Sequence, residues 1–207
     1  VLPQTMDPKT FSDQTAIVTG GASGLGLAIA RRLHAQGAYV VIFDRDESRF
    51  APVQNEFGAR GTCRMVDVTD ETSVSQAVET IGAGRGRIDI LVNSAGITGP
   101  TNIKSHEFKL TDFETVMRIN LLGPFLMSKA VVPVMLKRGY GRVLHIASIA
   151  GKEGNAGMAA YSASKAALIG LAKSQGKDYA ETGVTVNAIA PAVVQTPMVE
   201  AMPAAQV

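Results

Sequence analysis

The chain has few of the residue types that build disulfides, metal sites and nucleic-acid surfaces. Its 207 residues include one cysteine, no tryptophan and only 5% aromatic side chains. The single cysteine, Cys63, excludes an internal disulfide and is typical of a reducing compartment, so we expect a cytoplasmic protein. The histidines His34, His106 and His145 lie far apart in the sequence and lack the spacing of metal ligands, so we expect no metal site.

Charge and long apolar runs are also scarce. The 20 basic and 18 acidic residues are spread along the chain without a basic tract, so we expect no nucleic-acid partner. The longest apolar segments are interrupted by Gly123, Lys129 or Pro133, well short of the ~20 apolar residues that a membrane span needs, so we expect no membrane partner. A hydrophobic content of 46% suits the core of one sizeable domain.

What the sequence does contain is a glycine-rich turn after the apolar run 16–18. Glycines there allow a tight turn, close approach of the backbone to a pyrophosphate, and close packing of the next helix, whose N-terminal amides face the anion. The strand that follows this helix, 39–43, ends at Asp44, where a carboxylate can accept hydrogen bonds from ribose hydroxyls. This order predicts a dinucleotide site that includes Gly20, Ser23, Gly24, Leu25, Gly26 and Asp44.

Strand-like apolar runs alternate with helical patterns along the whole chain. The six runs are residues 16–18, 39–43, 63–66, 88–92, 142–147 and 184–190. Segments long enough for crossover helices separate them, which predicts an α/β fold with a doubly wound, mostly parallel, Rossmann-like sheet in a single domain. Ligands of such sheets bind at the carboxyl edge of the strands, where the glycine-rich turn falls.

A second pattern places Tyr161 four residues before Lys165 in a helical stretch of small residues, downstream of Ser148. Side chains at i and i+4 share a helix face, so the ammonium can lie beside whatever the phenol touches. A phenol with a pKa near ~10 is a poor base at neutral pH, and lowering that pKa to about 7 takes roughly 4 kcal/mol. We expect Lys165 to supply much of that stabilisation.

Together these motifs resemble the short-chain dehydrogenase/reductase family. The residues that carry the resemblance span nearly the whole chain: Thr19-Gly20-x-x-x-Gly24-x-Gly26, Asp67-Val68, Asn93-Ser94-Ala95-Gly96, Asn120, Ser148, Tyr161-x-x-x-Lys165, and Pro191 with Thr196. The resemblance implies that Tyr161 is the general acid and base, that Ser148 donates a hydrogen bond to the substrate oxygen, and that Lys165 also holds the nicotinamide ribose. It implies further that Asn120 bends its helix and holds a water that connects the lysine to solvent.

The same resemblance assigns further cofactor contacts. Asp67 and Val68 would contact the adenine, and Pro191 and Thr196 would lie near the nicotinamide. The segment with Asn93, Ala95 and Gly96 would line the adenine-ribose side and tie strands together. We expect NAD as the cofactor, because the Asp44 carboxylate repels a 2′-phosphate, although Arg45 beside it is a possible phosphate partner for NADP.

The expected activity is NAD(H)-dependent hydride transfer between a nicotinamide and a secondary alcohol or ketone. Segments 96–100 and 151–155 resemble those of bacterial sugar-acid dehydrogenases, which favours a small polar substrate such as a 2-keto-3-deoxy sugar acid. Lys152 and Asn155 are candidates to bind it, with solvent exposure as the other reading. Two alternatives stay open: an NADPH-dependent 3-oxoacyl thioester reductase, and a nucleotide-binding module without turnover.

The chain departs from the family pattern in two places. Pro191-Ala192 stands where the family usually has Pro-Gly, so we expect the backbone there to be less free. The chain also ends at Val207, before the seventh strand and last helix expected of such a fold. We therefore expect residues 1–12 to form a loose leader and residues 13–207 a catalytic domain truncated in the substrate lid. A dimer or tetramer is expected, built through Ala160, Ala163, Ala167, Gly170 and the segment 131–136.

Overall fold

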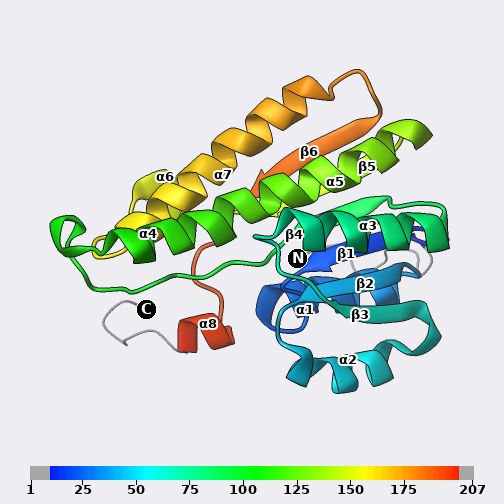
Figure 1. The fold of residues 1–207 in the computed structure, drawn as a ribbon, viewed down its shortest axis with the longest axis horizontal. Helices are drawn as coiled ribbons and strands as arrows, with labels where there is room; N and C mark the ends of the chain where they lie inside the picture. Colours follow the sequence, from blue (N-terminus) through cyan, green and yellow to red (C-terminus); the bar gives the residue numbers. More distant parts are fainter. Residues whose placement is uncertain (1–9, 201–207) are drawn as a thin grey trace, which may run out of the picture.

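The computed structural model describes residues 10–200, which form a parallel sheet between two layers of helices (Figure 1). The sheet has six strands in the order β3-β2-β1-β4-β5-β6, and every neighbouring pair is parallel. These strands are β1 (Thr15–Thr19), β2 (Tyr39–Asp44), β3 (Gly61–Met65), β4 (Ile90–Asn93), β5 (Gly141–Ile146) and β6 (Val184–Ile189). The predicted Rossmann-like fold class and all six predicted strands are confirmed.

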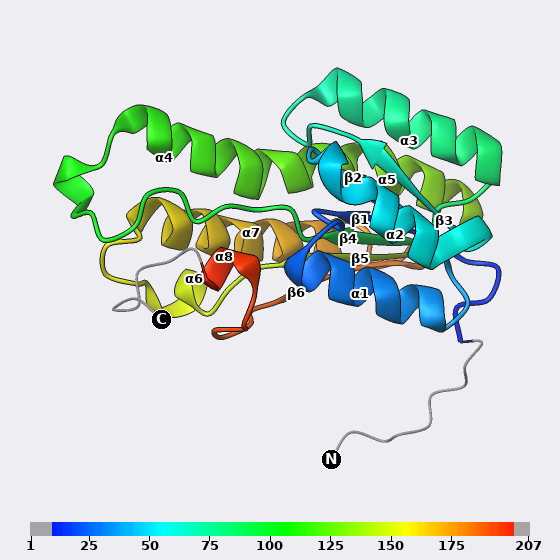
Figure 2. The ribbon, with the colours of Figure 1, turned by 90° about the horizontal axis from the view of Figure 1, so that it is seen from below.

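Helices cover both faces of this sheet. Helices α1 (Gly24–Ala35) and α2 (Phe50–Phe57) pack on one face, and α3 (Glu71–Arg85), α5 (Gly123–Arg138) and α7 (Ala159–Asp178) pack on the other. Figure 2 shows α1 and α3 on opposite sides of the strands. Short helices α4 (Leu110–Met117), α6 (Ala150–Glu153) and α8 (Pro197–Glu200) lie toward the end where the strands terminate.

The central strands are buried on both faces, which explains their nearly continuous apolar sequences. Ile17 and Val41 contribute to the core under α3, α5 and α7, whereas Val18 and Ile42 contribute to the core under α1 and α2. The segment 131–136, predicted to contact a second subunit, belongs largely to the first core, because Val131, Val132 and Met135 are buried there. Ala160 is buried as well, so these residues are unable to face another chain.

The longest helical stretch runs from Leu110 to Arg138 through α4, a π-helical turn and α5. By length and composition alone this helix could cross a membrane, although Gly123, Lys129 and Pro133 lie within its apolar sequence. Half of its most apolar window is buried inside the protein, and core helices of soluble proteins pass the same test. It is therefore weak evidence for a membrane contact.

At the N-terminal end, the described chain packs against the domain earlier than expected. Residues 1–9 of the expected leader lie outside the described residues, but Phe11 packs against the core under α1 and α2. Its N–H also donates to the Gln36 carbonyl oxygen at 2.9 Å. These contacts place Phe11 with the domain, two residues before the boundary expected at residue 13. Cys63 lies on β3 and is half-buried.

Candidate active site

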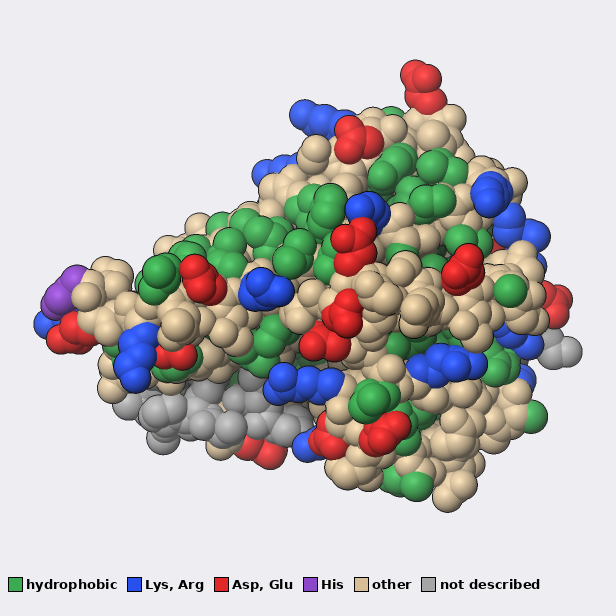
Figure 3. All heavy atoms as spheres, viewed as in Figure 1, with side chains coloured by type: hydrophobic (Ala, Val, Ile, Leu, Met, Phe, Trp, Pro, Cys, Tyr) green, Lys and Arg blue, Asp and Glu red, His purple; other side chains and the backbone are tan. Residues whose placement is uncertain are grey.

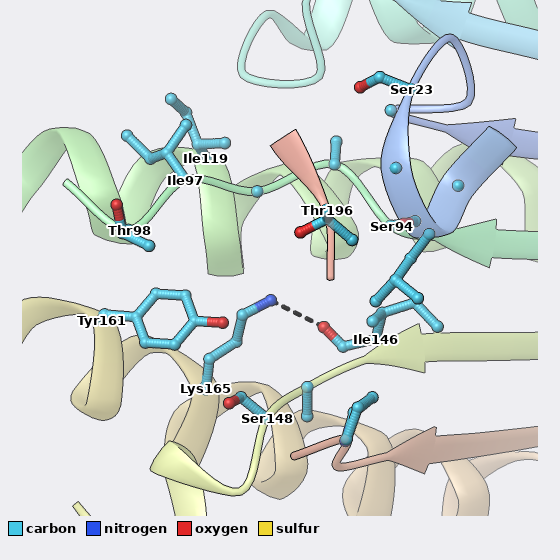
Figure 4. Close-up of a pocket in the computed structure, with 18 of the residues that line it drawn as sticks. Ser23, Ser94, Ile97, Thr98, Ile119, Ile146, Ser148, Tyr161, Lys165 and Thr196 are labelled. Carbon is cyan, nitrogen blue, oxygen red and sulfur yellow. Dashed lines mark hydrogen bonds between the residues drawn. The ribbon is translucent and has the colours of Figure 1, made fainter. Parts of the chain in front are cut away.

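A cavity of about 510 Å³ opens at the carboxyl edge of the strands. Its wall brings together most of the residues singled out in the sequence: Gly20, Ser23, Gly24, Leu25, Gly26, Asp44, Asp67, Val68, Ala95, Gly96, Ser148, Tyr161, Lys165, Pro191 and Thr196. Figure 4 shows how the labelled side chains converge on this space from the glycine-rich turn, from the segment after β4, and from α7. Asn93 and Asn120 are buried behind the wall.

The glycine-rich turn leaves room for a phosphate because its backbone is packed too closely for side chains. Gly20 has φ +62°, and a Cβ on it would lie 2.8 Å from the Ala95 Cα. A Cβ on Gly26 would run into the Gly20 carbonyl oxygen. The Thr19 hydroxyl oxygen accepts the N–H groups of Ser94 and Ala95, each at 3.1 Å, and so ties the segment after β4 to β1. With the N-terminus of α1 facing the cavity, this cradle fits a dinucleotide pyrophosphate.

Two carboxylates stand at the ends of the neighbouring strands. Asp44 accepts hydrogen bonds from the N–H groups of Ala22 at 3.1 Å and Asp46 at 3.2 Å, which fixes it beside the glycine-rich turn. Asp67 accepts two hydrogen bonds from Thr69, both at 2.8 Å. These bonds, with a smaller contribution from the positive charges of Arg45 and Arg118, lower the pKa of Asp67. Asp67 can therefore accept from a nucleotide as an anion at neutral pH.

Ser148, Tyr161 and Lys165 form the other end of the site. Figure 4 shows Tyr161 and Lys165 projecting from α7 with their polar ends toward the same part of the cavity, and Ser148 beside them. The Lys165 ammonium lies 5.7 Å from the centre of the Tyr161 ring and donates to the Ile146 carbonyl oxygen at 2.7 Å. Lys165 is only 5% exposed, and this burial lowers its pKa to about 8.

The expected fall of the Tyr161 pKa toward neutrality is not found in this arrangement. Burial raises the pKa of Tyr161, and a side-chain hydrogen bond with Ser148 opposes that effect only in part. The physical reason is that burial penalises the phenolate, while the ammonium directs a hydrogen bond to the Ile146 carbonyl oxygen. Tyr161 is therefore a protonated phenol at neutral pH and is ready to donate a proton.

Asn120 lies in the π-helical turn Arg118–Leu122, where the family resemblance implies a bend. Its side-chain oxygen accepts the Ile97 N–H at 2.9 Å, and its amide donates to the Ile97 carbonyl oxygen at 2.9 Å and to the Ser164 hydroxyl at 3.0 Å. These bonds hold the segment after β4 against α7. The water that the family resemblance assigns to Asn120 stays a prediction.

A sequence profile described as short chain dehydrogenase matches residues 14–206. The chain belongs to the short-chain dehydrogenase family. It is 45% identical to a Sphingomonas (strain SKA58) 2-dehydro-3-deoxy-L-rhamnonate dehydrogenase (NAD(+)), over 95% of this chain and 78% of the relative. It is 39% identical to the 3-oxoacyl-(acyl-carrier-protein) reductase of Escherichia coli (strain K12), over 93% of this chain and 78% of the relative.

Solved structures agree with this membership. The chain superposes with a TM-score of 0.88 on a 3-ketoacyl-(acyl-carrier-protein) reductase from Brucella melitensis complexed with NADH. That match has 29% sequence identity and covers 92% of this chain and 80% of the other. The chain is thus an oxidoreductase of the short-chain dehydrogenase family with a Rossmann-like nucleotide-binding fold.

Of the two roles predicted for Asn93, the structure shows the tying of strands and not the contact with the cavity. Asn93 ends β4 at 2% exposure and does not line the cavity. Its amide nitrogen lies 3.2 Å from Nδ1 of His145 on β5, so it ties two strands together beneath the site. The physical reason is strand alternation: the side chain of Asn93 points into the core, and the following residues Ser94 to Gly96 turn toward the cavity.

One wall of the cavity is not predicted by the sequence motifs. Thr115, Arg118 and Ile119 line it from α4 and the π-helical turn. Their i, i+3 and i+4 spacing puts them on one helix face, and their place just before Asn120 was the available signal. Asn155 lines the cavity as expected, whereas Lys152 is exposed outside it.

The Pro191-Ala192 departure has a simple structural outcome. Among the described residues, the only non-glycine residues with positive φ are Asp13 and Asn102, so Ala192 adopts an ordinary conformation. The Pro191 carbonyl oxygen accepts the Ile149 N–H at 2.9 Å, which joins this segment to the residues after Ser148. Alanine is therefore accommodated here without backbone strain.

Proposed function

We propose that the chain is an NAD-dependent dehydrogenase that oxidises the secondary alcohol of a small sugar acid and reduces the corresponding ketone. The observation that carries this proposal is the meeting of Ser148, Tyr161 and Lys165 with the glycine cradle and Asp44 in one cavity. The 45% identical relative, named as an NAD(+) dehydrogenase of a 2-dehydro-3-deoxy sugar acid, supports both the cofactor and the substrate class.

The residues divide the chemistry between them. A nicotinamide bound in this cavity would supply the hydride acceptor or donor. Tyr161 donates its phenolic proton to the substrate oxygen during ketone reduction. During alcohol oxidation the phenolate, formed when Tyr161 loses that proton to solvent, removes the hydroxyl proton. Ser148 donates a hydrogen bond to the same oxygen as its charge changes. Lys165 stabilises the phenolate that Tyr161 becomes and offers further donor hydrogens to a ribose hydroxyl.

A second candidate is NADPH-dependent reduction of a 3-oxoacyl thioester, which the 39% identical Escherichia coli relative supports. Asp44 weighs against it, because a carboxylate at the end of β2 repels the 2′-phosphate of NADPH. Arg45 is exposed beside Asp44 and is the residue that would favour this alternative.

Initial rates on a substrate panel test the proposal. The panel holds 2-keto-3-deoxy sugar acids, other polyols and keto acids, and 3-oxoacyl thioesters, each with both cofactors. We expect turnover of a sugar acid with NAD. Turnover confined to thioesters with NADPH would replace the proposal by the second candidate. Nucleotide binding in calorimetry with no turnover on the panel would indicate a binding module.

We further propose that the protein forms a dimer or tetramer through α4, α5 and α7. An apolar groove lined by Met117, Arg118, Leu121, Leu122, Phe125 and Leu171 lies on these helices. Apolar side chains also gather over this part of the surface (Figure 3). Phe125 is 43% exposed at the groove. Sedimentation at micromolar concentration should give an oligomer. Phe125→Glu should weaken this oligomer, whereas Met65→Glu, at an exposed apolar site on β3, should leave it unchanged. A wild-type monomer would contradict the proposal.

A further inference from the structure

Beneath the active site lies a buried row of polar side chains that the mechanism above does not use. Asn93 ends β4, His145 lies on β5 and Gln175 lies on α7, at 2%, 0% and 7% exposure respectively. His145 is paired in register with Asn93 across the sheet. The three elements are the ones that lead to the site: β4 runs into Ala95 and Gly96, β5 runs into Ser148, and α7 carries Tyr161 and Lys165.

The hydrogen bonds in this row assign one state to the imidazole. The Asn93 amide is a donor, so Nδ1 of His145 accepts from it at 3.2 Å. The proton then lies on Nε2, which donates to the Gln175 side-chain oxygen at 3.0 Å. Burial and the nearby charge of Lys165 lower the pKa of His145, and the Gln175 bond opposes this effect. The ring is neutral and adds no second cation below Lys165.

This row anchors α7 to β5 at a second point. The first anchor is the Lys165 ammonium on the carbonyl oxygen of Ile146, the residue directly after His145. Lys165 and Gln175 are separated by roughly 15 Å along the helix axis, from the rise per residue of an α-helix. The two contacts are this far apart on α7 but fall on the adjacent residues His145 and Ile146 of β5, so α7 is unable to slide along the strand without breaking one of them.

The row of polar side chains also stabilises the fold less than packed apolar side chains would. The side-chain oxygen of Asn93 is buried without a hydrogen-bond partner among the described residues. An unsatisfied buried acceptor destabilises a fold, because no hydrogen bond replaces the water that it lost. A row that served only stability would be better replaced by apolar side chains of similar volume, so its geometry points to a positional role.

We propose that the His145–Gln175 hydrogen bond is a positioning contact that fixes α7 on β5 and so keeps the Lys165 ammonium beside Tyr161. His145 and Gln175 act through Lys165 and do not touch the substrate. If the bond is lost, α7 gains freedom at its far anchor, and the ammonium stabilises the phenolate less well. The proposal rests on the oxidoreductase function given above.

The test compares Gln175→Leu with Gln36→Leu, a matched loss of a buried glutamine at the end of α1 (4% exposed). The readout is the ultraviolet titration of Tyr161 with NAD present, obtained by subtracting the same titration of each protein carrying Tyr161→Phe. We expect Gln175→Leu to raise the apparent pKa of Tyr161 by about one unit, a tenfold change in phenolate stability. We expect kcat to fall by roughly tenfold, within the ~10²-fold cost of a 1 Å misplacement, with KM nearly unchanged. Gln36→Leu should leave the titration as in the wild type.

A double variant separates positioning from stability. His145→Leu with Gln175→Leu removes both partners, so Tm should recover toward the wild-type value relative to the single variant. The Tyr161 titration and kcat should not recover. Recovery of Tm, of the Tyr161 titration and of kcat together would overturn the proposal. A Gln175→Leu titration identical to that of the wild type would also overturn it. Because the titration needs no substrate, a wrong substrate assignment would appear as absent turnover with the titration shift intact.

Discussion

The cofactor end and the catalytic end of this site are built by different means. At the cofactor end, close packing of the backbone shapes the site. Gly20 packs on Ala95, and the Thr19 hydroxyl oxygen accepts hydrogen bonds from two backbone N–H groups. At the catalytic end, hydrogen bonds of buried polar side chains position the site. These bonds are Asn120–Ser164, Lys165–Ile146 and His145–Gln175. The first construction tolerates no added atoms, whereas the second tolerates no lost polar groups.

This difference also divides the electrostatics. The carboxylates of Asp44 and Asp67 are partly open to solvent and are held by backbone or short-range bonds, so their charges cost little. Lys165 is nearly fully buried, and no carboxylate forms an ion pair with it among the described residues. The catalytic end therefore holds a charge at a cost in stability, and variants at the two ends should lose different properties.

The largest effect is expected from Tyr161→Phe, which removes one hydroxyl at the catalytic end. Loss of a general acid and base lowers rates by about 10²–10⁴-fold, so kcat should fall by that factor. The NAD dissociation constant should stay within about twofold of the wild type, because the cradle is untouched. Steady-state kinetics and calorimetry measure the two quantities. A variant that keeps more than a tenth of the wild-type kcat would contradict the assignment of Tyr161.

The next effect concerns the stability cost of Lys165 and depends on pH. Burial lowers its pKa from 10.5 to about 8, so between these values the unfolded chain binds a proton that the folded chain does not. Stability therefore rises with pH across this window, and below pH about 8 the full cost is present, roughly 3 kcal/mol. Chemical denaturation of wild type and Lys165→Met across the window measures this difference. A constant difference between the two proteins would show that the lysine is not desolvated.

The third effect is expected from a substitution in the glycine-rich turn at the cofactor end. Gly20→Ala adds a Cβ that would lie 2.8 Å from Ala95, at a residue with φ +62°. Gly58→Ala is its matched control, because Gly58 has φ +54° and no atom within 4 Å of the added Cβ. Both should lose about 1–3 kcal/mol of stability from the left-handed conformation. Only Gly20→Ala should weaken NAD, by roughly tenfold or more, in calorimetry; equal NAD affinities would refute the close-packed cradle.

The same contrast explains what the sequence could predict. The cofactor end is coded by neighbours in the chain, so the glycine-rich turn, Asp44 and the six strands were found from spacing and periodicity. The catalytic trio was found from its helical spacing and family resemblance. The partners that hold it were not, because Gln175 and Ser164 meet His145 and Asn120 only after the sheet has assembled. The pKa of Tyr161 was misjudged for the same reason: burial is a property of the fold.

The smallest effect is expected at Asp44, where one side chain decides cofactor choice. Its carboxylate already accepts the N–H groups of Ala22 and Asp46, and its position at the cavity wall leaves acceptor capacity for ribose hydroxyls. Asp44→Ala should weaken NAD by about 1.5 kcal/mol, the lower value for a hydrogen bond to a charged group.

NADP should bind Asp44→Ala better than it binds the wild type, because the repulsion of its 2′-phosphate is gone and Arg45 remains as a partner. The two affinities must therefore move in opposite directions. That outcome distinguishes contact with the ribose from loosening of the turn, since loss of the Ala22 hydrogen bond alone would weaken both cofactors equally. Dissociation constants for both cofactors with both proteins decide the matter, and an unchanged NAD/NADP ratio would mean that Asp44 orders the turn without reading the ribose.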